Sequence, residues 1–264
     1  MANYKTKKRF GQHFLHDAGV IKQIIRDINP HVNERFVEIG PGLGALTFPL
    51  LEKIDALDVI EIDRDVIARL EQYKNKKLTI HSVDALKFDL DSLSTTPALE
   101  SETQLRVVGN LPYNISTPLI FHLLEYAHSI KDMHFMLQNE VVQRITAAPD
   151  SKTYGRLSVM VQYFCETEYL LFVSPQAFNP PPKVDSAILR LTPWKELPYR
   201  ANDEKHLSKL VAQAFSMRRK TLRNTLKKML SSEQIESVGV DPSLRPENIS
   251  VAEYVALSNL SVEL

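Results

Sequence analysis

Three segments of the chain carry residues whose types and order suit the binding of a small polar ligand. In Val37-Glu-Ile-Gly-Pro-Gly-Leu-Gly44 the glycines let the backbone approach a ligand that a Cβ atom would exclude. Glu61 and Asp84 each follow an apolar stretch further along the chain. Because open α/β sheets bind ligands at the carboxyl ends of their strands, the glycine turn and the two acids predict one shared site.

The glycine turn leaves the kind of ligand open. Gly40-x-Gly42-x-x-Ala45 satisfies the dinucleotide fingerprint, and Glu61 could accept hydrogen bonds from ribose hydroxyls, as the acidic residue of that fingerprint does. The pattern fits a nicotinamide cofactor as well as another cofactor that carries adenosine. A tight turn from strand to helix that binds nothing is the alternative interpretation.

A second turn with the character of a site, Gly109-Asn-Leu-Pro-Tyr-Asn-Ile115, follows a predicted strand. The amino group of adenine is a poor nucleophile, because its lone pair is delocalised into the ring. The Asn110 side-chain oxygen and the Leu111 carbonyl could each accept one N–H and turn that lone pair toward an electrophilic methyl group. Pro112 would fix the direction of the carbonyl, and Tyr113 could stack on the base. A purely structural turn is the alternative.

Periodic patterns of apolar residues predict the elements that position these turns. Strands are predicted at residues 35–39, 56–62, 77–81, 105–108 and 133–137, and helices at 17–28, 45–53, 64–73 and from 116 onward. Strands that alternate with helices predict parallel pairing, and therefore an open, doubly wound α/β sheet. The polar segment 94–104 is predicted to be a surface loop.

The character of the chain changes near residue 200. Before that point a helix is predicted at 155–164, and two strands at 169–173 and 184–191 could form an antiparallel edge of the sheet. Beyond it only helices are predicted, at residues 204–217, 221–230, 232–238 and 251–260. We therefore expect a sheet domain over residues 1–200 and a small helical domain over residues 201–264.

The composition, with 264 residues of which 44% are hydrophobic and 24% charged, is typical of a globular protein. The single cysteine, Cys165, excludes an internal disulfide and a cysteine-rich zinc site, and the eight histidines are dispersed, so no metal site is predicted. No apolar stretch reaches membrane-spanning length, and the first ten residues do not resemble a signal peptide. A cytoplasmic protein without membrane contact is expected.

The formal net charge of zero argues against a nucleic-acid partner, but the charges are segregated. Residues 205–230 contain eight Lys or Arg and no acid, and residues 1–16 add four more without an acid. Without these twelve, the 32 basic residues fall to 20 against 32 acidic ones. On the predicted helix 221–230 and just before it, Arg219, Arg223 and Lys227 recur at spacing four, which would place them on one helix face that could follow phosphates. A solvated helix face is the alternative.

Seven segments in this order resemble the ribosomal RNA adenine dimethyltransferases. They are Phe10-Gly-Gln-His-Phe-Leu15, Glu38-Ile-Gly-Pro-Gly-Leu-Gly44, Asn110-Leu-Pro-Tyr113, Tyr154-Gly-Arg-Leu-Ser158, Phe178-Asn-Pro-Pro-Pro-Lys-Val-Asp-Ser186, Arg218-Arg-Lys-Thr-Leu-Arg-Asn224 and Pro246-Glu-Asn-Ile-Ser250. The resemblance covers nearly the whole chain. It implies a Rossmann-like S-adenosylmethionine-dependent methyltransferase fold with a small helical C-terminal domain.

The resemblance also implies roles for individual residues. The cofactor would contact His13, Leu15, Gly40, Glu61, Asp84 and Asn110, with Glu61 at the ribose hydroxyls and Asp84 at the adenine amino group. The target base would be held by Asn110, Leu111 and Tyr113, with Phe178 packed opposite Tyr113. RNA would be bound by Arg218, Arg219, Lys220, Arg223 and Lys227. Position 13 departs from the commonest pattern of the family, which has Asn there.

By resemblance the substrate is a pair of adjacent adenosines in a hairpin loop near the 3′ end of small-subunit rRNA. Each would be dimethylated at N6, in an assembling small subunit, by a monomeric enzyme that flips the base from its stack. An NAD-dependent oxidoreductase would explain the glycine turn but not Asn110-Leu-Pro-Tyr113 or the basic segment. A ribosome-assembly factor that binds without turnover stays open, because binding and catalysis use the same residues.

Overall fold

The computed structural model describes residues 12–94, 104–217 and 219–262. It divides the chain into two compact units, the first formed by residues 1–142 and 168–193 and the second by residues 143–167 and 194–264. The change of unit therefore falls at Trp194, close to the expected position of 200. The second unit also takes in residues 143–167, which the sequence prediction had left in the sheet domain, because α7 (Arg156–Phe164) packs against the C-terminal helices α8 and α11.

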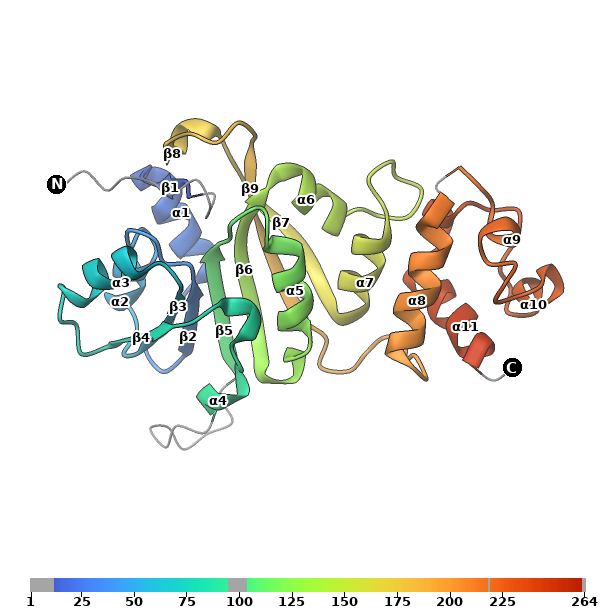
Figure 1. Ribbon diagram of the computed structural model, residues 1–264, viewed down its shortest axis with the longest axis horizontal. Helices are drawn as coiled ribbons and strands as arrows, with labels where there is room; N and C mark the ends of the chain where they lie inside the picture. The colour runs from blue at the N-terminus through green and yellow to red at the C-terminus, as the bar shows by residue number, and fades with distance from the viewer. Residues whose placement is uncertain (1–11, 95–103, 218, 263–264) are drawn as a thin grey trace. The chain divides into compact units, whose positions relative to one another are not determined.

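The first unit is built on the predicted α/β sheet (Figure 1). Its seven strands lie in the order β4-β3-β2-β5-β6-β9-β7. They are β2 (Arg35–Ile39), β3 (Leu57–Glu61), β4 (Leu78–Ser82), β5 (Leu105–Asn110), β6 (Ile130–Gln138), β7 (Cys165–Val173) and β9 (Ser186–Pro193). Strands β2 to β6 pair in parallel, and β9 pairs with β6 in the antiparallel sense, so both predicted features are confirmed.

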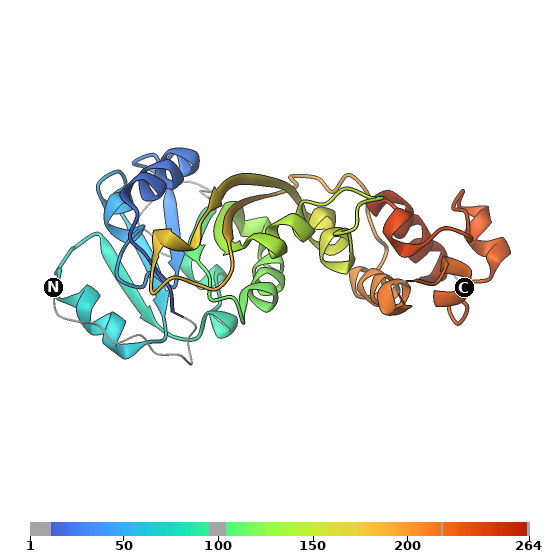
Figure 2. The same cartoon turned by 90° about the horizontal axis from the view of Figure 1, so that it is seen from above.

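Helices cover both faces of this sheet, with α1 and α5 on opposite sides (Figure 2). The helices are α1 (Ala18–Ile28), α2 (Thr47–Leu51), α3 (Arg64–Glu71), α4 (Asp91–Ser94), α5 (Ser116–Leu124) and α6 (Asn139–Ile145). Helix α1 begins where the sequence indicated, because the Asp17 side chain accepts from the Val20 N–H. Its residues Ile24, Ile25 and Ile28 share one buried cluster with apolar residues of β2, β3, α2 and α3. Of the predicted loop 94–104, residues 95–103 lie outside the described part of the chain.

A second, two-stranded sheet was not predicted. In it β1 (Phe14–Leu15) pairs antiparallel with β8 (Phe178–Asn179), so that Leu15 lies opposite Phe178. Strands of two residues are too short to show an alternating pattern in a sequence. The pair nevertheless fixes the position of Phe14 and Leu15, which border the candidate site.

The second unit is helical as expected, with one correction. Its later helices are α8 (Glu204–Ala214), α9 (Leu222–Thr225), α10 (Ser232–Ser237) and α11 (Val251–Val262). The helix predicted at 221–230 is only four residues long, because the chain continues in tighter turns after Leu226, where the Met229 N–H bonds to the Leu226 carbonyl three residues earlier. No helix in the described residues is long and apolar enough to span a bilayer.

A buried ion-pair network joins three elements at the opposite end of the sheet from the glycine turn. The Arg106 guanidinium donates to Asp132 at 2.9 Å and to Glu34 at 2.6 Å, and it also reaches the Ile28 carbonyl at the end of α1. Burial alone would raise the pKa of Asp132, but the nearby His134 and Arg106 lower it below its ordinary value. The network therefore ties α1 to β5 and β6.

We expect Arg106→Met to lower the free energy of unfolding by about 3–5 kcal/mol, because it leaves the buried Asp132 carboxylate without its cation and removes one of the two cations bonded to Glu34. The matched control is Lys131→Met, which removes a half-exposed partner of the same Glu34 and should cost less than about 1 kcal/mol. Urea unfolding of the three proteins measures both values. Equal effects of the two substitutions would contradict the assigned importance of Arg106.

A buried acid connects β2 to α2. The Glu38 side chain is only 2% exposed and accepts a hydrogen bond of 2.6 Å from the Thr47 hydroxyl. Burial raises the pKa of Glu38 from its ordinary 4.5 to about 7, and the bond from Thr47 offsets only part of that rise. The folded protein therefore holds a proton at Glu38 that the unfolded chain releases near pH 4.5.

This raised pKa predicts a particular pH dependence. Between pH 4.5 and 7 the folded state binds more protons than the unfolded state, so the contribution of Glu38 to stability falls as the pH rises, by about 3 kcal/mol. The difference in unfolding free energy between the wild type and Glu38→Gln should shift by that amount across this range. Glu52→Gln, the same change at an exposed acid, is the matched control. A flat difference for Glu38→Gln would show that its pKa is ordinary.

Candidate functional site

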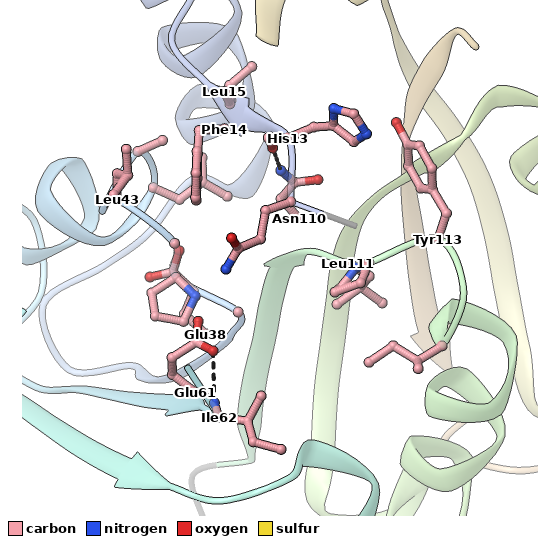
Figure 3. A pocket seen from close by; sticks show the side chains of 18 of the residues that line it. His13, Phe14, Leu15, Glu38, Leu43, Glu61, Ile62, Asn110, Leu111 and Tyr113 are labelled. Atoms are coloured by element: carbon pink, nitrogen blue, oxygen red, sulfur yellow. Dashed lines mark hydrogen bonds between the residues drawn. The ribbon is translucent and has the colours of Figure 1, made fainter. Parts of the chain in front are cut away.

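A cavity of about 270 Å³ opens at the carboxyl ends of the parallel strands (Figure 3). It collects residues from the N-terminal segment, the glycine turn, the ends of β3 and β4, and the turn after β5. Among the predicted site residues, His13, Leu15, Gly40, Glu61, Asp84, Asn110, Leu111 and Tyr113 line it. The structure therefore brings the glycine turn, the acids Glu61 and Asp84, and the Asn110 turn together in one cavity.

The glycine turn has the conformation that glycine permits. Gly40 and Gly42 have φ angles of 67° and 55°, a left-handed region that other residues rarely adopt. A Cβ atom on Gly42 would lie 3.1 Å from the Phe14 ring. The turn thus packs closely against Phe14, and both border the cavity.

The acidic end of the cavity is formed by the last residue of β3 and by the loops that follow β3 and β4. Glu61 Oε1 accepts from the backbone N–H groups of Ile62 and Asp63, at 2.7 and 2.8 Å, which holds its carboxylate in place. Burial raises the pKa of Glu61, while these two bonds lower it in part. Asp84 caps a short 3₁₀ turn by accepting from Leu86 N. The exposed side chain of Ile62 lines the same end and offers an apolar surface for a flat ring.

The opposite end of the cavity is formed by the turn after β5. The Asn110 side chain donates through Nδ2 to the His13 carbonyl at 3.0 Å, so Oδ1 is the amide atom that can accept from a ligand (Figure 3). Leu111 is anchored because its N–H donates to the Met136 carbonyl. The Tyr113 hydroxyl is hydrogen-bonded to Ser186 at 2.7 Å. Two acceptors and an aromatic ring are therefore held at one edge of the cavity.

Phe178 does not line the cavity, contrary to the role that the resemblance implied. Its side chain is 2% exposed and packs in the main hydrophobic cluster, which also contains Leu15. Strand pairing with β1 explains this position, because it turns the Phe178 side chain to the core and fixes the backbone of residues 14–15 beside it. In this structure Phe178 supports the N-terminal segment instead of facing Tyr113.

The basic residues of the second unit do not share one helix face, contrary to the sequence prediction. Arg223 lies in α9, whereas Arg219 and Lys220 precede this helix and Lys227 follows it. All four are exposed. Arg218 lies outside the described residues. The cations therefore come from a short helix and the turns on either side of it.

The lining residues that were not predicted from the sequence include Glu38 and Gln12. Glu38 lines the cavity from within β2, and Gln12 lines it from the N-terminal segment, where its amide donates to Asp63 at 2.9 Å. The signal for Glu38 was available, since it is an acid inside an otherwise apolar strand directly before the glycine turn. Gln12 gave no such signal, because its partner Asp63 is distant in the sequence.

Known proteins resemble this chain over almost its full length. The family described as ribosomal RNA adenine dimethylase matches residues 3–262. A Ribosomal RNA small subunit methyltransferase A from Alcanivorax borkumensis is 56% identical over 262 residues, covering 99% of this chain and 92% of the relative. The protein of the same name from Pseudomonas aeruginosa is 57% identical over 263 residues, covering 99% and 96%.

Two solved structures of related enzymes have a similar fold. A dimethyladenosine transferase from Plasmodium falciparum has a TM-score of 0.77 at 25% identity, covering 93% of this chain and 96% of its own. The 23S rRNA methyltransferase ErmE shares the fold, with a TM-score of 0.71 at 23% identity, covering 94% and 98%. The Rossmann-like methyltransferase fold is therefore confirmed, and the nicotinamide interpretation of the glycine turn is wrong. The chain belongs to the ribosomal RNA adenine dimethylase family and is a methyltransferase that uses S-adenosylmethionine.

Proposed function

We propose that this enzyme dimethylates N6 of two adjacent adenosines in a hairpin loop near the 3′ end of small-subunit rRNA. It would act as a monomer on the assembling small subunit in the cytoplasm. The names of its relatives, which are more than half identical, support the small subunit as substrate. The proposed chemistry rests on the Asn110 amide. Its Nδ2 donates to the His13 carbonyl, which leaves Oδ1 to accept from a substrate, and the other end of the same cavity has the acids Glu61 and Asp84 that an adenosine could bond to.

The residues of the cavity fit S-adenosylmethionine. The backbone at Gly40 can approach the methionine part, because no Cβ atom occupies that position. The Glu61 carboxylate is oriented by two N–H groups and would accept from the ribose hydroxyls, and Asp84 would accept from the adenine amino group. Ile62 and Leu43 provide apolar surface for the adenine ring. When bound there, the cofactor supplies a methyl group on a positively charged sulfur.

The residues after β5 would orient the target base. Asn110 Oδ1 and the Leu111 carbonyl would accept the two N6–H groups, which directs the lone pair of the nitrogen toward the cofactor. Tyr113 would stack on one face of the ring. These groups position the base and need not act as nucleophiles, since the chemistry rests on orientation and on the cofactor itself.

The exposed cations of the second unit would bind rRNA. Arg219, Lys220, Arg223 and Lys227 all lie within nine residues of sequence, and we propose that they contact phosphates, together with Arg218. Because they come from turns as well as from α9, they suit irregular RNA structure better than one straight groove.

The decisive experiment is transfer of labelled methyl groups to small subunits from a strain that lacks this modification, followed by mapping of the modified nucleotides. We expect four methyl groups per subunit, two on each of the two adenosines. Incorporation at another nucleotide would contradict the proposed substrate. Binding of the subunit without incorporation would instead support an assembly factor that lacks turnover.

Asn110→Ala should lower the rate of methyl transfer by about 100-fold or more, because a lost orienting acceptor misplaces the reacting nitrogen. Binding of the subunit should change little, since most of that affinity is expected from phosphate contacts. Single-turnover rates and filter binding measure the two effects. Asn33→Ala, the change of an exposed amide that does not line the cavity, is the matched control. A normal rate for Asn110→Ala would refute the role assigned to its amide.

The double substitution of Arg219 and Arg223 by Ala should weaken subunit binding. It should also make the slope of log binding constant against log salt concentration shallower, by the amount expected for up to about two lost phosphate contacts. The control is Arg200→Ala with Lys195→Ala, which removes two exposed cations of the same unit outside the basic segment. Binding titrations between low and high salt give both slopes. An unchanged slope for the first variant would exclude these arginines from phosphate contact.

A further inference from the structure

A second cleft lies in the first unit between α1 and α2, and it contains none of the groups assigned above to the cofactor or the target base. Its volume of about 530 Å³ lies within the range of about 300–1,000 Å³ that is usual for ligand pockets. One wall is a stripe of α1 at helical spacing, formed by residues 18, 21, 22, 25, 26 and 29. The other wall is formed by Ala45, Pro49, Glu52 and Lys53, within α2 and at its two ends. We call this feature the α1–α2 cleft.

The floor of the α1–α2 cleft is apolar. Ile25 is 6% exposed and belongs to the main hydrophobic cluster, so the core of the unit fixes its position. Ile21 and Pro49 are half-buried and add apolar surface on either side. Ala18 and Ala45 are too small to fill the space between the two helices. A flat apolar group can therefore be covered in this cleft without rearrangement of the core.

The rim of the cleft is cationic. Lys22 and Arg26 of α1 and Lys53 after α2 are exposed. Within the described part of the chain, no hydrogen bond or ion pair engages their side chains. Lys22 and Arg26 are four positions apart, which places them on one side of the helix. Among the described residues that line the cleft, Glu52 is the only acid, so three positive charges stand against one negative charge. The cleft therefore favours an anionic ligand.

An apolar floor below a cationic rim fits a nucleotide better than it fits a bare anion. The flat face of a base can lie on apolar side chains, while Lys and Arg contact the phosphates on either side of it. A cleft of this volume admits one nucleotide but no RNA duplex, and unpaired nucleotides of loops and bulges can be splayed out of their stack. The family acts on ribosomal RNA, so such nucleotides are present in its own substrate.

We propose that the α1–α2 cleft binds an unpaired nucleotide of small-subunit rRNA, with the base on Ile21 and Pro49 and the phosphates at the three cations. This proposal rests on the proposed function and extends it, because it adds an RNA contact on the catalytic unit to the cations of the second unit. The bound nucleotide differs from the target adenosine, which needs Asn110. Of the described residues, Ala45 alone lines both cavities.

The double substitution Lys22→Ala with Arg26→Ala tests the rim. We expect the affinity for the small subunit to fall about tenfold near 0.1 M salt. The slope of log binding constant against log salt concentration should become shallower by up to about two phosphate contacts. The matched control, Arg64→Ala with Lys76→Ala, removes an exposed arginine and an exposed lysine of the same unit that do not line the cleft. Cofactor affinity, measured by calorimetry, should equal the wild-type value in both. A slope unchanged from the wild type overturns the proposal.

A second variant tests whether a base enters the cleft. Ala18→Trp adds a large ring to the wall and keeps every cation, so it should also weaken subunit binding. Ala56→Trp, the same change at an exposed alanine that does not line the cleft, should leave binding unchanged. Thermal unfolding of both variants shows whether they are folded. Normal binding by folded Ala18→Trp overturns the proposal, because the cations would then contact phosphates at the surface only.

Crosslinking identifies the occupant without any change to the floor or the cations. The full chain with Glu52→benzoylphenylalanine, irradiated in complex with small subunits, should label an unpaired nucleotide of the rRNA. Crosslinks to a ribosomal protein alone, or to paired nucleotides alone, overturn the proposal. These measurements follow binding and not turnover. A wild type that binds the subunit without methylating it, but gives the expected crosslink, would refute the proposed function and support the assignment of the cleft.

Discussion

Parallel pairing of β2 with β3 and with β5 places the ends of three strands at one edge of the sheet. Ile39 lies opposite Ile60, and Glu38 lies opposite Val108, so the residues that follow these strands emerge side by side. Glu61, Gly40 and Asn110 are neighbours for this reason alone. A shift of one residue in either pairing would turn every side chain of that strand to the other face and disperse the site.

The carboxyl ends of the parallel strands and the loops after them form most of the cavity wall. The remaining side is formed by residues 12–15, which contact three of these loops: Gln12 bonds to Asp63, Phe14 packs on Gly42, and the His13 carbonyl accepts from Asn110. Their own position depends on β8 and on Phe178 in the core. Phe178 therefore contributes to the site through packing, at a distance from the cavity itself.

The sequence was sufficient to predict features that local chemistry determines. The glycine turn, the acids after β3 and β4, and the Asn110 turn could be recognised because each needs particular residue types at a fixed spacing. The direction of a side chain depends on distant partners, and for this reason the core position of Phe178 could not be predicted. The short length of α9 could not be predicted either, because the apolar pattern continues to residue 230 although the chain forms turns from residue 227.

The pairing of β1 with β8 also has a consequence for synthesis of the protein. His13 and the Pro180 carbonyl that holds its ring are 167 positions apart. A ribosome produces residues 12–15 early, and their partners Asp63, Gly42 and Asn110 follow with the central strands. The strand that pairs with β1 and the carbonyl that accepts from His13 are made only after β7. The central sheet from β2 to β6 can therefore form on the growing chain before the β1–β8 pair closes the cavity, so that formation of the sheet and completion of the cavity are separate events.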